Sequence, residues 1–283
     1  MKITKSIAET RAAARALKSS GKKLGLVPTM GALHDGHLSL VQLAKRQCDA
    51  VAASIFVNPK QFGPKEDFAK YPRSFEGDRE MLEAEGVELL FAPSVEEMYP
   101  SGSTTFVNVE GLSERLDGVS RPGHFRGVAT VVSKLLHIVE PDKAFFGQKD
   151  AVQVAIIKRM VHDLDLPVEI VVGPIVREPD GLAMSSRNAY LDAKQRKQAL
   201  VLSRALKRVE ASIRDGEVDT NRLVNAAKRI FAEEPEVRVD YIAMVDPDTL
   251  DPINDVANGA LIAVAAYVGS TRLIDNVVIE PKR

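Results

Sequence analysis

Two histidines stand three residues apart in the segment PTMGALHDGH, residues 28–37. A short apolar run precedes this segment, and its two glycines allow a tight backbone where a helix begins. Backbone N–H groups at a helix N-terminus attract anions, and imidazoles beside them can donate hydrogen bonds to phosphate oxygens. His34 and His37 therefore indicate a phosphate site, with surface or packing histidines as an equally common alternative. A zinc pair is disfavoured because no cysteine or further histidine lies nearby to complete a ligand set.

A lysine occupies a similar setting in the segment FFGQKD, residues 145–150. An apolar run, a glycine and then Lys149 suggest a strand, a turn and a helix start. An ammonium group at that place supplies a point charge for a polyphosphate. In isolation, a solvated surface lysine explains the segment equally well.

The segment GLAMSSRN, residues 181–188, offers two hydroxyls and a guanidinium in succession. Arg187 can contact phosphate through two parallel hydrogen bonds, and Ser185 and Ser186 add neutral donors. The alternative is a capping loop before a helix that begins near Asp192.

An alternation of strands and helices must position these three clusters. Ser6 and Glu9 form an S-x-x-E capping box for the first helix, and continuous apolar runs are typical of strands that are covered on both faces. Alternating elements of this kind predict βαβ units and a mostly parallel sheet, an α/β fold. The predicted strands are residues 23–29, 51–57, 87–91, 143–146 and 168–172, and the predicted helices are near 7–18, 38–44, 74–85, 128–139 and 152–161.

The pattern changes after residue 176. A long amphipathic helix around Leu202 and Val209 and a second helix after Thr220 precede three strands, VRVDYIAMV, GALIAVAAYVG and RLIDNVVIE. Helices followed by strands predict a smaller α+β domain, so we expect domains at 1–176 and 177–283. Ligands of open parallel sheets bind beyond the carboxyl ends of the strands, where the three clusters can converge in one crevice.

Composition narrows the classes of function. The 283 residues carry a formal net charge of −1, so no overall basic field draws the protein onto nucleic acid. The single cysteine, Cys48, excludes an internal disulfide and leaves no cysteine-based zinc site. The first 21 residues contain no apolar signal region, and no run approaches the roughly 20 apolar residues of a membrane span. We expect a cytoplasmic protein without nucleic-acid or membrane partners.

The clusters also belong to a longer series of motifs. PTMGALHDGH, SIFVNPKQF, YPR, RPGHFRGV, FFGQKD and GLAMSSRN, in this order and spacing, closely resemble the pantothenate synthetase family of the HxGH nucleotidylyltransferase superfamily. The resemblance is dense from about residue 22 to 192 and looser to 283. It implies a Rossmann-like N-terminal domain, a C-terminal lid and a homodimer. It also implies that pantoate attacks ATP to give pantoyl adenylate and pyrophosphate, and that β-alanine then yields pantothenate and AMP, with Mg²⁺ accompanying ATP.

The resemblance also assigns site residues. His34, His37, Lys149, Ser185, Ser186 and Arg187 would be catalytic, and His37 matches the proton donor of the family. Asp150 would contact the ribose, and the backbone of Val176 the adenine. The ATP site would comprise Met30, Gly31, His34, His37, Gly147, Lys149, Asp150, Val176, Met184, Ser185, Ser186 and Arg187.

Neutral amides would bind the hydroxy acid. Gln61 and Gln153 would hydrogen-bond pantoate, with Gln61 also near the incoming β-alanine, and Asn58, Tyr71 and Arg121 match further positions around the substrates and the lid. No protein residue is implied as a metal ligand. Gln148 departs from the family pattern, because many relatives have glutamate there.

Three other interpretations remain for the same sequence. A nucleotidylyltransferase that stops at an adenylylated product would not need the amide pair Gln61 and Gln153. A tRNA-binding protein would need an extended basic surface, which the near-neutral charge disfavours. A dinucleotide-binding module would need G-x-G-x-x-G after the first strand, and neither this motif nor a P-loop is present.

Overall fold

Six short, largely apolar segments pair in one parallel sheet. In the computed structural model, which describes residues 1–64 and 66–281, the strand order is β1-β4-β3-β2-β5-β6. Parallel strands need crossover connections, and helices provide most of them. The strands are β1 (Lys2–Thr4), β2 (Leu24–Thr29), β3 (Ala50–Ile55), β4 (Leu89–Phe91), β5 (Lys143–Gly147) and β6 (Glu169–Gly173).

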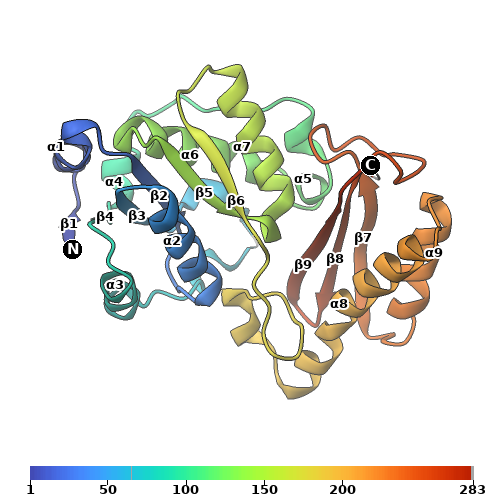
Figure 1. Ribbon diagram of the computed structural model, residues 1–283. Coiled ribbons are helices and arrows are strands. Elements are labelled where there is room, and N and C mark those ends of the chain that lie inside the picture. Colours follow the sequence, from blue (N-terminus) through green and yellow to red (C-terminus); the bar gives the residue numbers. More distant parts are fainter. Residues whose placement is uncertain (65, 282–283) are drawn as a thin grey trace.

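Helices cover both faces of this sheet (Figure 1). On one face, α1 (Ile7–Lys18), α6 (His124–Val139) and α7 (Ala151–Asp163) pack in one apolar cluster. On the other, α2 (Asp35–Gln47) and α3 (Phe75–Ala84) pack in a separate cluster. Burial of both faces explains why the strands read as continuous apolar runs rather than as alternating ones.

A three-stranded antiparallel sheet follows in the chain. It consists of β7 (Val237–Val245), β8 (Ala260–Val268) and β9 (Thr271–Ile279), with α8 (Ala193–Arg214) and α9 (Thr220–Phe231) on its outer face. Side chains of β8 alternate between two cores: Ile262 packs with α8 and α9, whereas Leu261 and Ala263 join the cluster of α6 and α7. The small sheet is therefore packed between its own helices and the larger part of the molecule.

The predicted α/β class and the alternating elements are confirmed. Ser6 caps α1 in the expected capping box, and Asp192 caps α8. Strand β3 ends at Ile55, so the prediction that it reaches residue 57 was wrong, and α6 begins four residues before the predicted start. Pattern reading missed β1 and the short helices α4 (Val95–Met98) and α5 (Asp117–Ser120), which are too short to show a period.

The order of the strands opens a crevice beside β2. Strand β2 pairs with β3 along its whole length but with β5 only at Gly25–Lys143 and Leu26–Ala144. The chain leaves β2 toward β3 on one side, while β5 lies on the other. Such a switch point is where open parallel sheets bind ligands, beyond the carboxyl ends of the strands.

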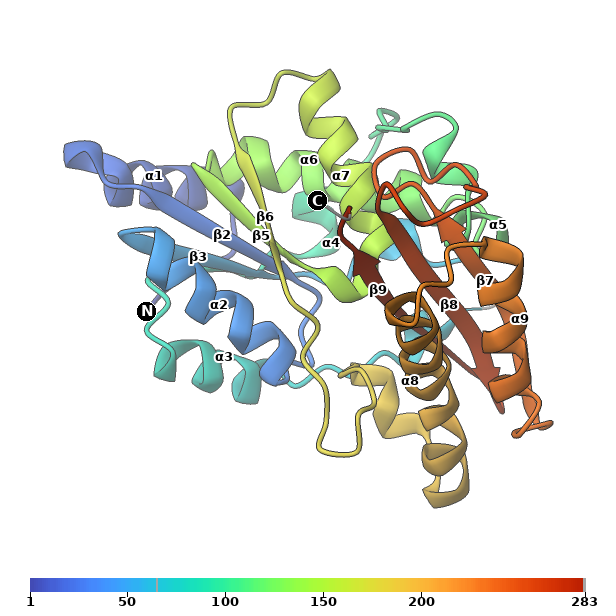
Figure 2. The same ribbon diagram turned by 45° about the vertical axis from the view of Figure 1, so that its right-hand side comes forward.

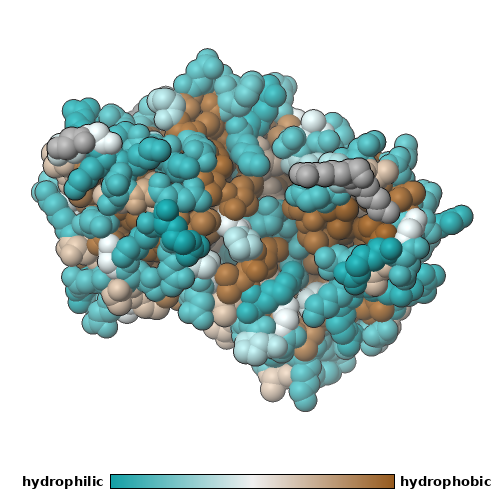
Figure 3. Space-filling view, in the orientation of Figure 1, coloured by the Kyte–Doolittle hydropathy of each residue, from teal (hydrophilic) through white to brown (hydrophobic). Residues whose placement is uncertain are grey.

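The face of the molecule in Figure 3 is mostly hydrophilic, with hydrophobic residues gathered in its middle and over the three-stranded sheet. Within residues 1–64 and 66–281, no helix combines the length and the apolar character needed to cross a bilayer.

Candidate active site

One cavity at the switch point collects the three polar clusters. His37, Lys149 and Arg187 all line it, although they follow different strands. The empty space within it is about 1340 Å³, a volume that includes open solvent at its mouth. Of the residues assigned from the resemblance, the lining contains Met30, His34, His37, Gln61, Tyr71, Arg121, Gly147, Lys149, Asp150, Gln153, Val176, Met184, Ser185, Ser186 and Arg187.

Gly31 and Asn58 lie outside this lining. Gly31 has φ +81°, and a side chain there would lie 2.9 Å from Asp78 Oδ2, so the glycine serves the turn itself. Asn58 is buried behind Gln61, and its Nδ2 donates to Gln61 Oε1 at 3.0 Å. Neither residue lines the cavity, and Asn58 acts on it only through Gln61.

The histidine loop (residues 30–37) is organised by its own helix start. His34 is the N-cap of α2, and its Nδ1 accepts from Gly36 N at 3.1 Å. His37 Nδ1 in turn receives the backbone N–H of His34 at 3.4 Å. A neutral imidazole that accepts at Nδ1 carries its proton on Nε2. Each ring therefore keeps an Nε2–H donor for a ligand.

Both rings are held in the neutral form. Burial, followed by the neighbouring His34, lowers the pKa of His37 to about 3. Burial and then the Lys149 ammonium lower the pKa of His34. Desolvation disfavours the charged imidazolium, and a nearby cation adds to this effect. Near neutral pH the two imidazoles are therefore neutral hydrogen-bond donors and not cations.

A buried carboxylate anchors the same loop. Asp78 on α3 is 1% exposed and accepts from Ala32 N at 2.8 Å and from Leu33 N at 2.9 Å. Ser74 Oγ donates to it as well, at 3.0 Å. Ala32 has φ +53°, an unfavourable value for a residue with a side chain. The charge-assisted hydrogen bonds that Asp78 accepts offset the cost of this backbone conformation.

The lysine turn (residues 147–150) joins β5 to α7. Lys149 Nζ lies 3.4 Å from Asp150 Oδ1. Burial is the largest single influence and raises the pKa of Asp150, but the charge and hydrogen bond of Lys149, together with the charge of Arg187, hold the pKa below its ordinary value. Asp150 is the only acidic residue among the described residues of the lining.

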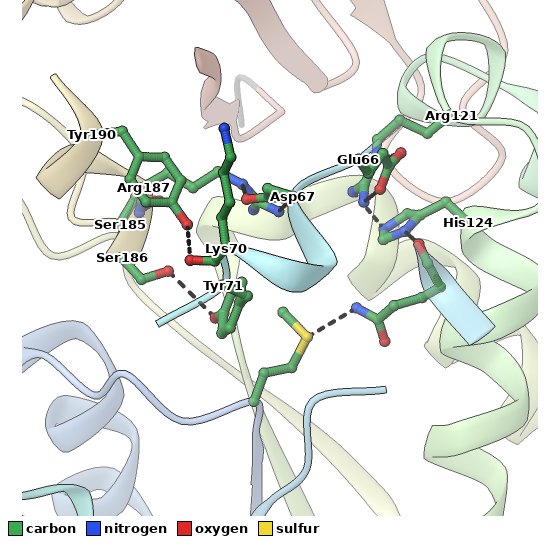
Figure 4. A network of polar contacts seen from close by, with 12 residues as sticks. Glu66, Asp67, Lys70, Tyr71, Arg121, His124, Ser185, Ser186, Arg187 and Tyr190 are labelled. Atoms are coloured by element: carbon green, nitrogen blue, oxygen red, sulfur yellow. Dashed lines mark hydrogen bonds and ion pairs between the residues drawn. The ribbon is translucent and has the colours of Figure 1, made fainter. Parts of the chain in front are cut away.

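The serine–arginine loop (residues 177–187) meets a second loop over the cavity (Figure 4). Arg187 makes two parallel hydrogen bonds to Asp67, both 3.0 Å, and Ser186 Oγ lies 3.3 Å from the Tyr71 hydroxyl. The Tyr190 hydroxyl also donates to Lys70 O at 3.3 Å. These contacts join segments that are more than a hundred positions apart.

The Gln61 amide has a defined orientation. The Tyr99 hydroxyl donates to Asn58 Oδ1 at 2.9 Å, so the Asn58 amide nitrogen points to Gln61 Oε1. Gln61 Nε2 is then turned toward Met30, where it meets the Sδ atom at 3.2 Å. Because a thioether is a weak acceptor, this N–H is available to a stronger one.

Arg121 is held by a glutamate and a histidine (Figure 4). Its guanidinium binds Glu66 through two hydrogen bonds, of 2.9 and 2.6 Å, and its Nη1 lies 2.9 Å from His124 Nε2. His124 Nδ1 lies 2.8 Å from Gln61 O. Burial, followed by the charge of Arg121, lowers the pKa of His124 to about 3. A neutral His124 thus accepts from Arg121 and donates to the backbone of Gln61.

Sequence reasoning missed several residues of this arrangement. His124 lines the cavity and stands in the quoted motif RPGHFRGV, so the motif itself was a usable signal. Glu66, Asp67 and Asp78 carried no local signal, because their partners lie far away in the chain. Five apolar residues that line the cavity were predicted only as parts of a helix and a strand: Val128, Val131, Val132, Leu135 and Phe146.

A protein-bound metal centre has no obvious donor set in the described ranges. Neither 1–64 nor 66–281 contributes a group of three or more His, Cys, Asp or Glu side chains able to hold an ion. The arrangement instead combines neutral donors, cations and one carboxylate, which suits a bound anion such as a triphosphate.

Known sequences of one family match the chain from end to end. The family model described as pantoate-beta-alanine ligase matches residues 2–278. The pantothenate synthetase of Acidobacterium capsulatum is 61% identical over 290 residues, an alignment that covers 99% of this chain and 97% of that protein.

Solved structures give the same result. The fold superimposes on a pantothenate synthetase from Thermus thermophilus with a TM-score of 0.94 and 48% identity, over 99% of this chain and 100% of that one. A pantoate-beta-alanine ligase from Francisella tularensis, in a complex with beta-gamma ATP and beta-alanine, has a TM-score of 0.80 and 35% identity over 98% and 97% of the two chains.

Proposed function

The chain belongs to the pantoate–β-alanine ligase family, and we propose that this ligase joins pantoate to β-alanine by way of a pantoyl adenylate. In the first step the pantoate carboxylate attacks the α-phosphorus of ATP, and the bond to pyrophosphate breaks. In the second step the β-alanine amine attacks the acyl carbon, and AMP leaves as pantothenate forms.

The observation that carries this proposal is the common cavity of His37, Lys149, Arg187 and Gln61. A carboxylate is already ionised near neutral pH, so the first step needs no general base. Its difficulty is the negative charge that accumulates on the phosphoryl oxygens and on the leaving pyrophosphate. Positioned donors and cations stabilise such charge, and they are the groups that line this cavity.

We assign the triphosphate to the histidine loop, the lysine turn and the serine–arginine loop. The Nε2–H groups of His34 and His37 would donate to phosphate oxygens, and the Lys149 ammonium would balance the departing charge. A bound anion raises the pKa of a neighbouring imidazole, which brings His37 closer to the proton-donor role that the family resemblance implies. Arg187 would exchange its Asp67 partner for phosphate.

The amides suit pantoate. Gln61 Nε2 faces a weak acceptor, Met30 Sδ, and can turn its N–H to a carboxylate or hydroxyl oxygen, while Gln153 lies on the same lining. A site built to bond a substrate hydroxyl rejects analogues without it by roughly 10⁴-fold or more. Arg121 and Tyr71 would complete the substrate side of the cavity.

Mg²⁺ is assigned to ATP rather than to a protein cage. This ion commonly retains waters and binds through one or two carboxylates together with substrate phosphates. Asp150, the acidic residue of the described lining, would be such a carboxylate, although the family resemblance implies that Asp150 contacts the ribose. When bound, Mg²⁺ would neutralise charge on the triphosphate.

We further propose that residues 177–283 act as a lid domain on residues 1–176. Pantoyl adenylate is hydrolysable, so exclusion of water would protect it. The serine–arginine loop bears Ser186 and Arg187, which already contact Tyr71 and Asp67 across the cavity. ATP with pantoate should protect this loop from protease, and unchanged cleavage would count against a lid.

The reaction has a direct test. The protein should exchange labelled pyrophosphate into ATP only when pantoate is present, and should release AMP from preformed adenylate when β-alanine is added. Pantoate-independent exchange would favour a simple nucleotidylyltransferase instead. Gln61→Ala should raise the KM for pantoate more than the KM for ATP, and equal changes would argue against the role of Gln61.

A further inference from the structure

Strand β9 contains two adjacent polar residues in the protein interior. Asp275 is 2% exposed and Asn276 is 3% exposed, between the apolar residues Ile274 and Val277 of the same strand. Burial of such groups is costly unless they are hydrogen-bonded. The hydrogen-bond partners of Asp275 and Asn276 therefore indicate what these two side chains stabilise.

Asn276 binds the lysine turn. Its Nδ2 donates to Gln148 O at 3.0 Å and to Lys149 O at 2.9 Å, and its Oδ1 accepts from Gln148 Nε2 at 3.0 Å. One side-chain amide thus holds two successive carbonyls of the turn and is itself oriented by Gln148. Figure 2 shows β9 passing beside the start of α7, where this turn lies.

Asp275 binds the serine–arginine loop from the same place. Its carboxylate makes two hydrogen bonds to Arg177, of 2.6 and 3.0 Å, and Arg177 Nη1 also donates to Gly181 O at 3.2 Å. Consecutive strand residues point to opposite faces. The centre of β9 is therefore connected to both of the cavity segments that follow β5 and β6.

We propose that Asn276 is a positioning residue of the nucleotide site, which holds the lysine turn so that the Lys149 ammonium faces the cavity. The inference rests on the proposed role of Lys149 in the reaction. Asn276 itself contacts the backbone of the turn and does not line the cavity. Displacement of a catalytic group by about 1 Å can slow a reaction roughly 100-fold, so two hydrogen bonds on the turn matter for the rate.

A double-mutant cycle separates positioning from ordinary stabilisation. Asn276→Ala is made in the wild type, in Lys149→Ala and in Gln61→Ala, and the kcat/KM for ATP is measured by pantoate-dependent pyrophosphate exchange. If Asn276 acts through Lys149, its removal should slow exchange about 10- to 100-fold in the wild type and in Gln61→Ala, but less than about 2-fold in Lys149→Ala. An equal loss in all three backgrounds would overturn the proposal.

Leu273→Ala is the matched control on the same strand. Leu273 is buried in the cluster of α8 and α9, so its truncation should lower the Tm by loss of packing. Its effect on exchange should be the same with and without Lys149. If Leu273→Ala gave the same dependence on Lys149 as Asn276→Ala, the positioning role would be refuted.

If the wild type showed no pantoate-dependent exchange, the proposed function would fail before any variant was compared.

Asn276→Asp provides a second measurement should the alanine variant not fold. It preserves the size of the side chain but places a carboxylate oxygen against the two carbonyls. A protonated carboxyl regains one donor, so exchange by Asn276→Asp relative to the wild type should recover as the pH falls. A ratio that does not change with pH would contradict a direct hydrogen-bonding role for Asn276.

Discussion

The histidine loop and the lysine turn present similar chemistry but are supported in different ways. His34 and His37 orient each other through a capping box on their own helix, and Asp78 anchors the loop from α3, on the same face of the six-stranded sheet. The lysine turn is held from outside that sheet, by Asn276 on β9. One half of the proposed nucleotide site is thus supported from within the six-stranded part of the molecule, while the other depends on a strand near the C-terminus.

A moving lid would displace the supports of only one of these two segments. A movement of the three-stranded sheet would carry Asn276 and Asp275 with it, and would disturb the lysine turn and the serine–arginine loop together. The histidine loop would keep its geometry, because its supports lie elsewhere. The cationic side of the site is therefore coupled to the C-terminal part, and the imidazole side is not.

The largest expected effect is loss of one donor from either half. His37→Ala and Lys149→Ala should each slow adenylation about 10²- to 10³-fold, as removal of a transition-state donor commonly does. Single-turnover formation of pantoyl adenylate measures this step directly. Full activity of Lys149→Ala would mean that the lysine turn has no part in the mechanism. The comparison of the lysine turn with the histidine loop would then have no functional meaning.

The support of the histidine loop can be broken at Asp78. Asp78→Ala leaves the backbone N–H groups of Ala32 and Leu33 and the Ser74 hydroxyl without their acceptor, and should reduce the free energy of unfolding by about 3 kcal/mol. Urea unfolding measures the loss, and Asp78→Asn, which retains one carbonyl acceptor, should lose less. Unchanged stability in Asp78→Ala would show that the loop does not need this anchor.

The neutral state of His37 predicts a pH dependence of stability. Its folded pKa of about 3 lies below the ordinary value near 6.5. As the pH falls from about 6.5 toward 3, His37 therefore binds a proton in the unfolded chain but not in the folded one. The resulting cost in the free energy of unfolding is on the order of 2 kcal/mol at pH 5. Above about pH 6.5 there is no such cost.

His37→Gln should remove this part of the acid sensitivity, as measured by Tm between about pH 4 and pH 8. A His37→Gln profile parallel to that of the wild type would mean that His37 is readily protonated in the folded protein.

The smallest effect is expected at the ion pair of Arg187. Arg187 and Asp67 are 26% and 23% exposed, and a partly exposed pair contributes about 1 kcal/mol or less. If ATP must displace Asp67, Asp67→Asn should lower the KM for ATP by up to about 5-fold. Glu66→Gln, which releases Arg121 instead, should not change this KM. A higher KM for ATP in Asp67→Asn would mean that Asp67 presents Arg187 to the nucleotide.

Local patterns explain how much of this molecule was predictable. The capping boxes of α1 and α8 and the apolar runs of the buried strands arise from contacts within a few residues, so their signals are present in the sequence. The three polar clusters were also visible, because each follows a strand and surrounds a helix start or a turn. The sequence by itself therefore determined the α/β class and the approximate positions of the buried strands, and it supplied the candidate residues for a triphosphate site.

The tertiary structure alone decided how those residues are held. Ala32 and Asp78 are separated by 46 positions, Arg187 and Asp67 by 120, and Asn276 and Lys149 by 127. No period or cap records such pairs, because the intervening chain can take many paths. The orientation of the Gln61 amide also depends on distant residues, through Tyr99 on Asn58 and through Met30. Residue types establish which chemistry is available, and long-range packing establishes where each donor points.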